Sequence, residues 1–279
     1  MRFGPAGIPL AVEGDTLEGL EYTAKIGLRA YEVEFVRGVH MSREKALELG
    51  KRARARGVSL SCHGPYWINC AAREKSKIAR SIHNIMDSAR AMQAMGGGVI
   101  VIHPAFYMER DKKEVYSQVK ETLNLALEKI KSEKLDKILV GLETSGKPTQ
   151  FGTVEELSML SAELPQTIPV IDFAHLHAVR NGWIKGKEQY SQIFDEIEKN
   201  LGLNYLKHFH SHYSNIEYTI KGERRHLEFS PSTGEPPFKP LAELIVERGY
   251  DGTIICETPL LDQDALRLQA IFREAGGKA

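Results

Sequence analysis

Histidine, aspartate and glutamate residues follow short apolar segments at many places along this chain. The set consists of His63, His103, Glu143, Asp172, His175, His208, His210, His212 and Glu257. Imidazole nitrogens and carboxylate oxygens are the ligands that Zn²⁺ takes when no thiolate is offered, and they also suit Mn²⁺ or Fe²⁺. The set is larger than one tetrahedral ion can use. It therefore predicts a cluster of two or three ions with bridging carboxylates.

Several divalent ions held together serve mainly in phosphoryl transfer, because one activates water while another steadies the leaving oxygen. Each residue alone also has a structural explanation, since Glu143 or Glu257 could simply be an ion-pair partner. Carboxylates are rarely buried unpaired, however, and six successive segments end in such a residue. We therefore interpret the set as metal ligands. His40, His83 and His177 are left out of it because their positions favour other roles.

The apolar segments that precede these residues have the length and composition of β-strands. They cover residues 2–7, 30–35, 57–63, 98–104, 138–144, 168–175, 205–212 and 252–259. Helical periodicity is found between them, over residues 16–26, 42–56, 75–95, 114–131, 153–163, 187–200, 238–248 and 262–275. Thr153 followed by Glu156 is a capping-box signature for the start of one helix.

This alternation of strand and helix predicts parallel strands joined by right-handed crossovers. In 279 residues it favours a (β/α)₈ TIM barrel over an open doubly wound sheet, and neither GxGxxG nor Walker A motifs are present. We expect one domain over residues 1–279. In such a barrel the C-terminal strand ends meet on one face, which would bring the ligands together. Residues 213–237, rich in Gly, Pro and Ser, are expected to form a long loop on this face.

The overall composition narrows the class of protein. The 37 basic residues balance the 37 acidic ones, so no global positive charge indicates nucleic-acid binding, although a local patch is compatible with this total. Cys62, Cys70 and Cys256 form no CxxC pair, which argues for a reducing compartment. We expect no signal peptide, because the first residues do not combine a basic segment with an apolar stretch, and no run of 18 apolar residues is present. We expect a cytoplasmic protein that does not span a membrane.

The motifs around the ligands resemble those of endonuclease IV, a family of zinc-dependent apurinic/apyrimidinic endonucleases with a (β/α)₈ fold. The resemblance extends from about residue 57 to residue 259 and is weakest at the N-terminus. It rests on HGPYWIN at His63, IHPA at His103, LETSGK at Glu143, DFAH at Asp172 and His175, FHSHYSN at His210, and ICETP at Glu257. These segments are similar to the family's HxxYxIN, HPG, ENTAGxG, DxxH, HxND and LET motifs.

The resemblance implies an assignment of ligands to ions. One Zn²⁺ would be held by His63, His103 and Glu143. A second would be held by Glu143, Asp172, His210 and Glu257. A third would take His175 and His226, the latter in ERRHLEF.

The resemblance also implies a substrate and a reaction. Such enzymes act as monomers on double-stranded DNA and hydrolyse the phosphodiester 5′ to an abasic site, with Glu143 at the centre of the catalytic cluster. Tyr66 and Trp67 match positions where the family inserts side chains into the duplex, and Arg37 is a candidate for a further inserted residue. Chemistry on an extrahelical nucleotide needs such wedges.

Two departures concern the metal ligands. The family's third-ion motif is DxH, whereas here Arg224 stands two residues before His226, and Glu223 precedes it. The third ion is therefore missing, weakly bound or held by Glu223. The Asn-Asp pair that follows the family's fifth histidine is replaced here by Ser211 and His212.

The alternative function is that of a single-metal sugar isomerase or epimerase of the related xylose-isomerase-like barrels. Such an enzyme would use only Glu143, Asp172, His210 and Glu257. The additional residues His63, His103, His175 and His226 favour the nuclease, because an isomerase needs no second or third ion. A barrel that binds nucleic acid or sugar without catalysis is a third possibility, against which the two complete ion sites argue.

Overall fold

The structure, a computed structural model, describes residues 1–135 and 137–279. Eight parallel strands form one sheet in the order β1-β12-β9-β8-β6-β4-β3-β2. A parallel bridge between Ala6 and Glu32 and a hydrogen bond from the Gly7 amide to the Glu32 carbonyl (2.9 Å) join the two ends of this sheet. The predicted (β/α)₈ barrel is confirmed.

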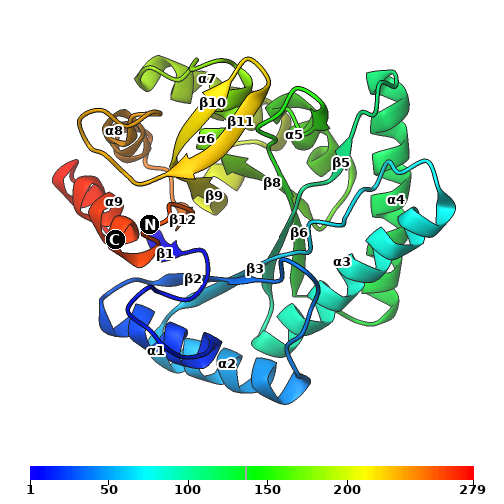
Figure 1. Ribbon diagram of the computed structural model, residues 1–279, viewed down its shortest axis with the longest axis horizontal. Helices are drawn as coiled ribbons and strands as arrows, with labels where there is room; N and C mark the ends of the chain where they lie inside the picture. Colours follow the sequence, from blue (N-terminus) through cyan, green and yellow to red (C-terminus); the bar gives the residue numbers. More distant parts are fainter. Residues whose placement is uncertain (136) are drawn as a thin grey trace.

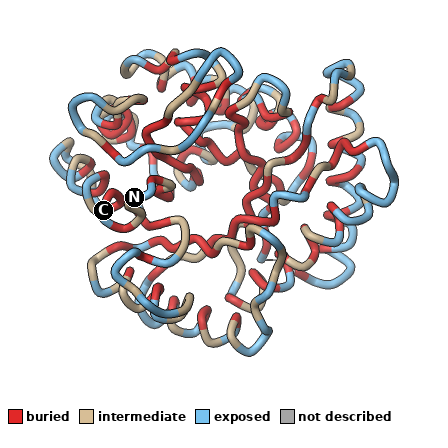
Figure 2. The backbone as a smooth tube through the Cα atoms, in the orientation of Figure 1, coloured by how far each residue is buried: buried red, intermediate tan, exposed pale blue. Residues whose placement is uncertain are grey.

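The barrel strands are β1 (Arg2–Pro5), β2 (Ala30–Glu34), β3 (Ser59–His63), β4 (Gly98–Ile102), β6 (Ile138–Glu143), β8 (Thr167–Asp172), β9 (Phe209–Tyr213) and β12 (Gly252–Cys256). The long helices are α1 (Thr16–Lys25), α2 (Arg43–Arg56), α3 (Lys75–Met95), α4 (Lys112–Ser132), α5 (Val154–Glu163), α7 (Lys187–Leu201), α8 (Phe238–Arg248) and α9 (Asp262–Glu274). They surround the strands in Figure 1, and Figure 2 shows that the buried backbone is concentrated in the inner ring.

Local sequence signals explain where several of these helices begin and end. Thr153 and Glu156 form the predicted capping box at the start of α5, and Asp15 forms another at α1. Helix α2 ends at Gly57, whose φ of 66° lies in the left-handed region that glycine adopts without steric cost. Within residues 1–135 and 137–279, no helix is long and apolar enough to cross a membrane.

Side chains alternate between the two faces of each barrel strand, and this alternation separates the core from the site. Tyr31 and Val33 of β2 and Val140 and Leu142 of β6 face outward and belong to the buried apolar core under the helices. Many inward positions of the barrel strands are polar. They include Glu32, Ser61, His63, Glu143, Asp172, His210 and His212, which are all buried. Ligand-type groups thus line much of the barrel interior, together with aliphatic side chains such as Val170, two residues before Asp172 on β8.

Two expected elements differ in the structure. The strand expected over 168–175 ends at Asp172, and α6 (Phe173–Val179) begins there because the Asp172 carboxylate accepts a hydrogen bond from the His175 amide (2.6 Å). The loop expected over 213–237 contains an antiparallel hairpin of β10 (Asn215–Thr219) and β11 (Gly222–Leu227), which projects over one end of the barrel in Figure 1. His175 and His226 therefore come from a helix and a hairpin.

Two smaller elements complete the barrel mouth and the approach to β9. Strands β5 (Ala105–Phe106) and β7 (Gln150–Phe151) pair in antiparallel fashion and tie together the loops that follow β4 and β6. A short 3₁₀-helix, η1 (Tyr205–Lys207), occupies the first part of the strand expected over 205–212. Strand β9 consequently begins at Phe209 and carries two inward-facing histidines, of which His212 is near its C-terminal end.

Candidate metal centre

A cavity of about 570 Å³ opens at the C-terminal ends of the barrel strands. Its titratable lining residues are Glu34, His63, Tyr66, His103, Glu143, His175, Glu223, His226 and Glu257. Among the described residues, no lysine or arginine lines it. Buried carboxylates without nearby cations are costly, so this cavity is suited to positively charged ligands.

The first group of candidate ligands comes from three adjacent strands, as the sequence predicts. His63 ends β3, His103 follows β4 and Glu143 ends β6. The Nε2 atoms of His63 and His103 lie 3.1 and 3.3 Å from the same oxygen, Oε2 of Glu143. One ligand atom from each residue lies within 4.8 Å of the others, so the three could hold one ion.

The second group consists of Glu143, Asp172, His212 and Glu257. Nδ1 of His212 lies 3.1 Å from Oε1 of Glu143 and 3.2 Å from Oε1 of Glu257. Oδ2 of Asp172 is buried and has no hydrogen-bond partner among the described residues. Three carboxylates that converge in a buried place, one with an unpartnered oxygen, fit a divalent cation.

His210 does not join this group, and His212 takes the place expected for it. Both side chains point into the barrel because they are two residues apart on β9. His212 stands nearer the C-terminal end of the strand, where the other ligands lie. His210 lies deeper, with its Nε2 3.2 Å from Oε2 of Glu32.

The third group combines Asp172, His175 and His226. Glu223 adjoins it, because its Oε2 lies 2.8 Å from Nε2 of His175. Arg224, which stands where the family motif has aspartate, is exposed and pairs with Glu217 on the hairpin. Hairpin β10–β11 thus turns the carboxylate of Glu223 toward the site and the arginine away from it.

The position of Glu223 depends on a glycine in the LETSGK segment. The Glu223 amide donates to the carbonyl of Gly146 (2.8 Å). A Cβ atom on Gly146 would lie 2.2 Å from Oε2 of Glu223 and 2.9 Å from Cδ2 of His175, which is closer than real contacts allow. Lys147 also pairs with Glu223 at 3.1 Å.

Three of the candidate histidines are oriented by backbone carbonyl oxygens. Nδ1 of His63 lies 2.9 Å from the carbonyl oxygen of Gly64, and Nδ1 of His175 lies 2.9 Å from that of Thr144. Nδ1 of His226 lies 3.0 Å from the carbonyl oxygen of Glu257. A carbonyl oxygen only accepts, so Nδ1 must carry a proton in each ring. The neutral ring then offers the lone pair of Nε2 to an ion, as metal-ligating histidines usually do.

Burial and neighbouring charges shift the pKa values of these ligands in opposite directions. Burial lowers the pKa of His103 to about 4. Burial also acts on His63, but the hydrogen bond and charge of Glu143 outweigh it and raise its pKa to about 10. Burial raises the pKa of Glu257 to about 8 and that of Glu34 to about 8. Without a cation, the centre therefore holds protons that a metal ion would displace.

The predicted DNA-contacting residues lie at the rim of the cavity. Tyr66 and Trp67 are 55% and 65% exposed, and the Tyr66 ring lies edge-on to His63 with 5.7 Å between ring centroids. Arg37 is exposed in the turn after β2, where the carbonyl of Val36 accepts a hydrogen bond from the Tyr66 amide (3.3 Å). The structure thus brings the three residues to adjoining loops, and their contact with DNA stays a prediction.

Two glutamates of β2 were missed by the sequence analysis. Glu32 is fully buried beside His210 and His212, and Glu34 lines the cavity, with its Oε1 lacking a hydrogen-bond partner in the described part of the chain. The signal was present in AYEVEF, where glutamates alternate with apolar residues at the strand period of two. Such alternation places both carboxylates on the inner face of the barrel.

The chain resembles known proteins over nearly all of its length. Residues 20–275 match the family described as the xylose isomerase-like TIM barrel. An uncharacterized protein from Methanocaldococcus jannaschii is 34% identical over 272 residues, which cover 98% of this chain and 97% of that protein. A probable endonuclease 4 from Aster yellows witches'-broom phytoplasma is 26% identical over 230 residues, covering 79% of this chain and 74% of the relative.

Two solved structures share the fold to nearly the same degree. A D-tagatose 3-epimerase-like protein has a TM-score of 0.73 at 21% identity, with 99% of this chain and 97% of that chain covered. Endonuclease IV from Thermus thermophilus has a TM-score of 0.71 at 21% identity, with 98% and 100% covered. These similarities support the architecture without distinguishing between two activities. On the family match over residues 20–275, the chain belongs to the xylose isomerase-like TIM barrel family.

Proposed function

We propose that this protein is a zinc-dependent endonuclease that hydrolyses the phosphodiester 5′ to abasic sites in double-stranded DNA. The observation that carries the proposal is that three ligand groups around one cavity share residues with one another. Glu143 belongs to the first and second groups, and Asp172 belongs to the second and third. Shared carboxylates of this kind suit adjacent ions, whereas proton or hydride transfer on a sugar requires only one.

The residues assigned to each ion follow from this geometry. His63, His103 and Glu143 would hold the first Zn²⁺, and Glu143, Asp172, His212 and Glu257 the second. Asp172, His175 and His226 would hold the third, with Glu223 supplying the carboxylate that the sequence lacks at Arg224. Bound zinc would polarise the phosphoryl oxygen and lower the pKa of a water molecule.

The carboxylates of the cavity favour bound cations. Glu34, Glu143, Glu223 and Glu257 line the cavity, and Lys147 pairs with Glu223 at 3.1 Å from outside this lining. Each of these carboxylates repels a phosphodiester anion when it is ionised, and bound cations would offset that repulsion. We therefore infer that the cations strengthen the binding of DNA at the centre.

The rim of the cavity is compatible with a flipped-out nucleotide. Tyr66 exposes its aromatic ring beside His63, and Trp67 is exposed next to it in the chain. Exposed aromatic side chains at a site commonly mark a binding function. Enzymes that act on an extrahelical nucleotide must hold open the space it leaves in the duplex. We propose that Tyr66, Trp67 and Arg37 do this. The probable endonuclease 4 among the relatives supports an endonuclease activity.

One observation favours the alternative, a single-metal sugar isomerase or epimerase. Glu34 presents a buried carboxyl oxygen to the cavity, and a sugar hydroxyl would be a suitable donor to it. The second ligand group alone would then hold one ion. The D-tagatose 3-epimerase-like structure shares this architecture.

Metal content and substrate together distinguish the two functions. Protein purified without chelator should carry two or more zinc equivalents per chain by elemental analysis, should run as a monomer, and should nick a duplex that contains one abasic-site analogue. A single Mn²⁺ or Mg²⁺ per chain, with epimerisation of a ketose and an intact duplex, would establish the alternative instead.

A further inference from the structure

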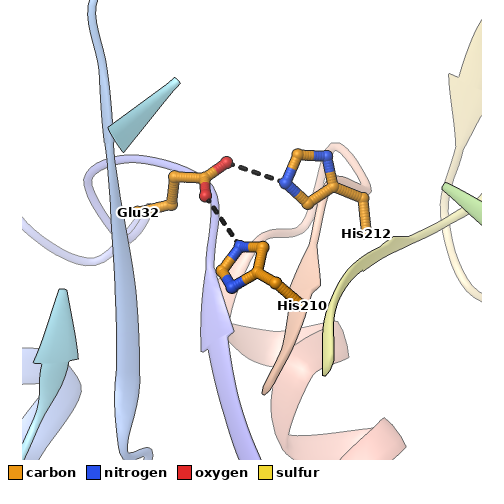
Figure 3. A group of neighbouring side chains, drawn as sticks. All are labelled: Glu32, His210 and His212. Carbon is orange, nitrogen blue, oxygen red and sulfur yellow. Dashed lines mark hydrogen bonds and ion pairs between the residues drawn. The ribbon is translucent and has the colours of Figure 1, made fainter. Parts of the chain in front are cut away.

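The ring of His212 is oriented by a different kind of chemical group from the one that orients three other candidate histidines. His63, His175 and His226 are held by backbone carbonyls, as described above. The Nδ1 atom of His212 faces the second ligand group, and its Nε2 atom lies 3.0 Å from Oε1 of Glu32 on the opposite side of the barrel (Figure 3). A carboxylate therefore stands beside His212 where these three rings have a peptide oxygen.

Glu32 is built into the barrel as a buried anion with several donors around it. Neither Glu32 nor His212 is exposed at all, and Ser61 and His210 are 3% and 5% exposed. The Ser61 hydroxyl donates to Oε2 of Glu32 (2.6 Å). Nε2 of His210 lies 3.2 Å from the same oxygen (Figure 3). These contacts leave Oε1 for His212. A buried carboxylate held this firmly has a fixed direction in which it accepts.

The position of Glu32 restricts where His212 can carry its proton. A neutral imidazole has one N–H, and the nitrogen without a proton repels a carboxylate oxygen at 3.0 Å. A proton on Nε2 satisfies Glu32 and leaves the Nδ1 lone pair for an ion among Glu143, Asp172 and Glu257. A neutral ring with its proton on Nδ1 would donate to Oε1 of Glu143 (3.1 Å), but it would block the ion and leave the lone pair of Nε2 against Glu32.

A cation between Glu32, His210 and His212 is the competing explanation of this cluster, since their ligand atoms also lie within 4.8 Å of one another. With an ion at Nδ1 as well, His212 would have to lose its last proton and bridge two ions as an imidazolate. Ser61 already donates to Glu32 in this cluster, and a contact of Glu32 with the N–H of a neutral ring requires no further deprotonation. Neither Oε1 of Glu32 nor Nε2 of His212 has a hydrogen-bond partner elsewhere in the described residues, so each is free to face the other. A neutral ring beside the carboxylate is therefore the simpler account.

We propose that Glu32 is a positioning residue that holds His212 as the Nε2–H tautomer, so that Nδ1 binds the second ion. This inference rests on the proposed metal site. His210 and Ser61 support Glu32 and do not contact the ion. Carboxylates that orient metal-ligating histidines typically contribute about 10–100-fold to metal affinity.

Glu32→Gln is the most informative variant. Ser61 would keep the amide oxygen at the position of Oε2, so the amide NH₂ group would face Nε2 of His212. A donor at that place favours the proton on Nδ1, which is the tautomer that cannot bind. We expect zinc affinity at the second site to fall about 10–100-fold in chelator competition. The variant Glu32→Asp keeps the charge but withdraws it by one methylene. Its zinc affinity should lie between those of wild type and Glu32→Gln.

The matched control is Glu235→Gln. Glu235 also faces a histidine, with Oε2 3.3 Å from Nε2 of His177, but neither residue belongs to a candidate metal group in the described chain. The zinc affinity of Glu235→Gln should equal that of wild type. If Glu32→Gln does not fold, Ser61→Ala tests the same support by removing one donor from Glu32, and a several-fold loss of affinity is expected.

A second measurement on the wild-type protein does not depend on any variant folding. Nitrogen-15 NMR of zinc-loaded protein with labelled histidine should show a proton on Nε2 of His212, with the signal assigned by its loss in His212→Asn. A proton on Nδ1, an Nε2 bound to a further zinc ion, or an unchanged affinity in Glu32→Gln would each overturn the proposal. Wild-type protein that binds no zinc would instead overturn the proposed function.

Discussion

The carboxylate of Glu223 lies 2.8 Å from Nε2 of His175, although Arg224 occupies the place of the expected aspartate in the chain. Regular alternation along β11 would put Arg224 on the same face as His226. The register shifts at this point, because Glu217 pairs with Arg225 and Tyr218 pairs with Glu223, which leaves Arg224 as the extra residue of a bulge. Glu223 and His226 can therefore both face the cavity while Arg224 faces the solvent. The third candidate ion site thus has a carboxylate beside it despite the departure in the motif.

Removing the Glu223 carboxylate should weaken the third ion. We predict that Glu223→Gln loses close to one zinc equivalent per chain relative to wild type in elemental analysis after dialysis, because a neutral amide is a much poorer zinc ligand. Arg224→Ala is the control, since Arg224 is exposed and pairs with Glu217. Equal zinc content in wild type and Glu223→Gln would show that Glu223 holds no ion.

Gly146 should prove essential to the same site for a steric reason. In Gly146→Ala the new methyl group would lie 2.2 Å from Oε2 of Glu223, so the carboxylate must move away from His175. We predict the same partial loss of zinc as in Glu223→Gln. Gly186→Ala is the matched control, because no heavy atom of the described chain lies within 4 Å of its added Cβ. Full zinc retention in Gly146→Ala would contradict this geometry.

Zinc loading should release protons at neutral pH. His63 has a pKa raised to about 10 and Glu257 a pKa raised to about 8, so both carry protons in the metal-free protein at pH 7. Zinc must displace these protons, and its apparent affinity should rise as pH increases toward these values. Calorimetric titrations in buffers of different ionisation enthalpy measure the number released. A value of zero at pH 7 would contradict the assigned protonation.

The stability of the metal-free protein should change with pH in a defined direction. The folded-state pKa of His63, about 10, lies above its ordinary value of 6.5. The stabilisation that this shift provides is complete below pH 6.5 and is lost as pH rises through about 10. We therefore expect the Tm of chelator-treated protein to fall over this interval. The variant His63→Gln should lack this stabilisation, so its Tm should fall less over the same pH interval. A fall in Tm as steep as in wild type would show that His63 does not cause it.

The aromatic side chains at the rim should affect DNA binding without affecting the metal. Truncating Trp67 to alanine should cost about 1–2 kcal/mol of binding energy, which is roughly a tenfold rise in Kd for abasic duplex. Zinc content should be unchanged, because Trp67 is exposed and belongs to none of the ligand groups. Met159→Ala, which removes a partly exposed apolar side chain from α5, serves as the control. Equal affinity for DNA in wild type and Trp67→Ala would show that the Trp67 side chain does not contribute to the DNA interface.

The fold could be predicted from the sequence because each barrel element carries its own local signal. The strand segments are short apolar runs, and the helices between them have clear periodicity, with the capping box at Thr153 and Glu156 found where it was expected. The hairpin of residues 215–227 gave no comparable signal. Its strands are largely polar, and its position depends on Gly222, whose φ of 92° permits the close approach to the Gly146 carbonyl.

Most residues of the candidate site could be predicted from the sequence, but not which of them contact one another. Strand ends of a barrel must converge, and so His63, His103, Glu143, Asp172 and Glu257 could be grouped from sequence. The choice between His210 and His212 could not be made, because both face inward and only their depth in the barrel differs. Glu32 was missed because its partners lie on β9, across the barrel, where no short motif relates the two strands.

The central claim is that a cluster of zinc ions held by Glu143 and its neighbours hydrolyses DNA at abasic sites. It is tested most directly by incubating zinc-loaded protein with a duplex that contains one abasic-site analogue and analysing the ends of the product. We predict a single nick 5′ to the analogue that leaves an extendable 3′-hydroxyl, with the rate at least about 10³-fold lower in Glu143→Gln. An intact duplex after incubation with protein that carries two or more zinc ions per chain would contradict the claim.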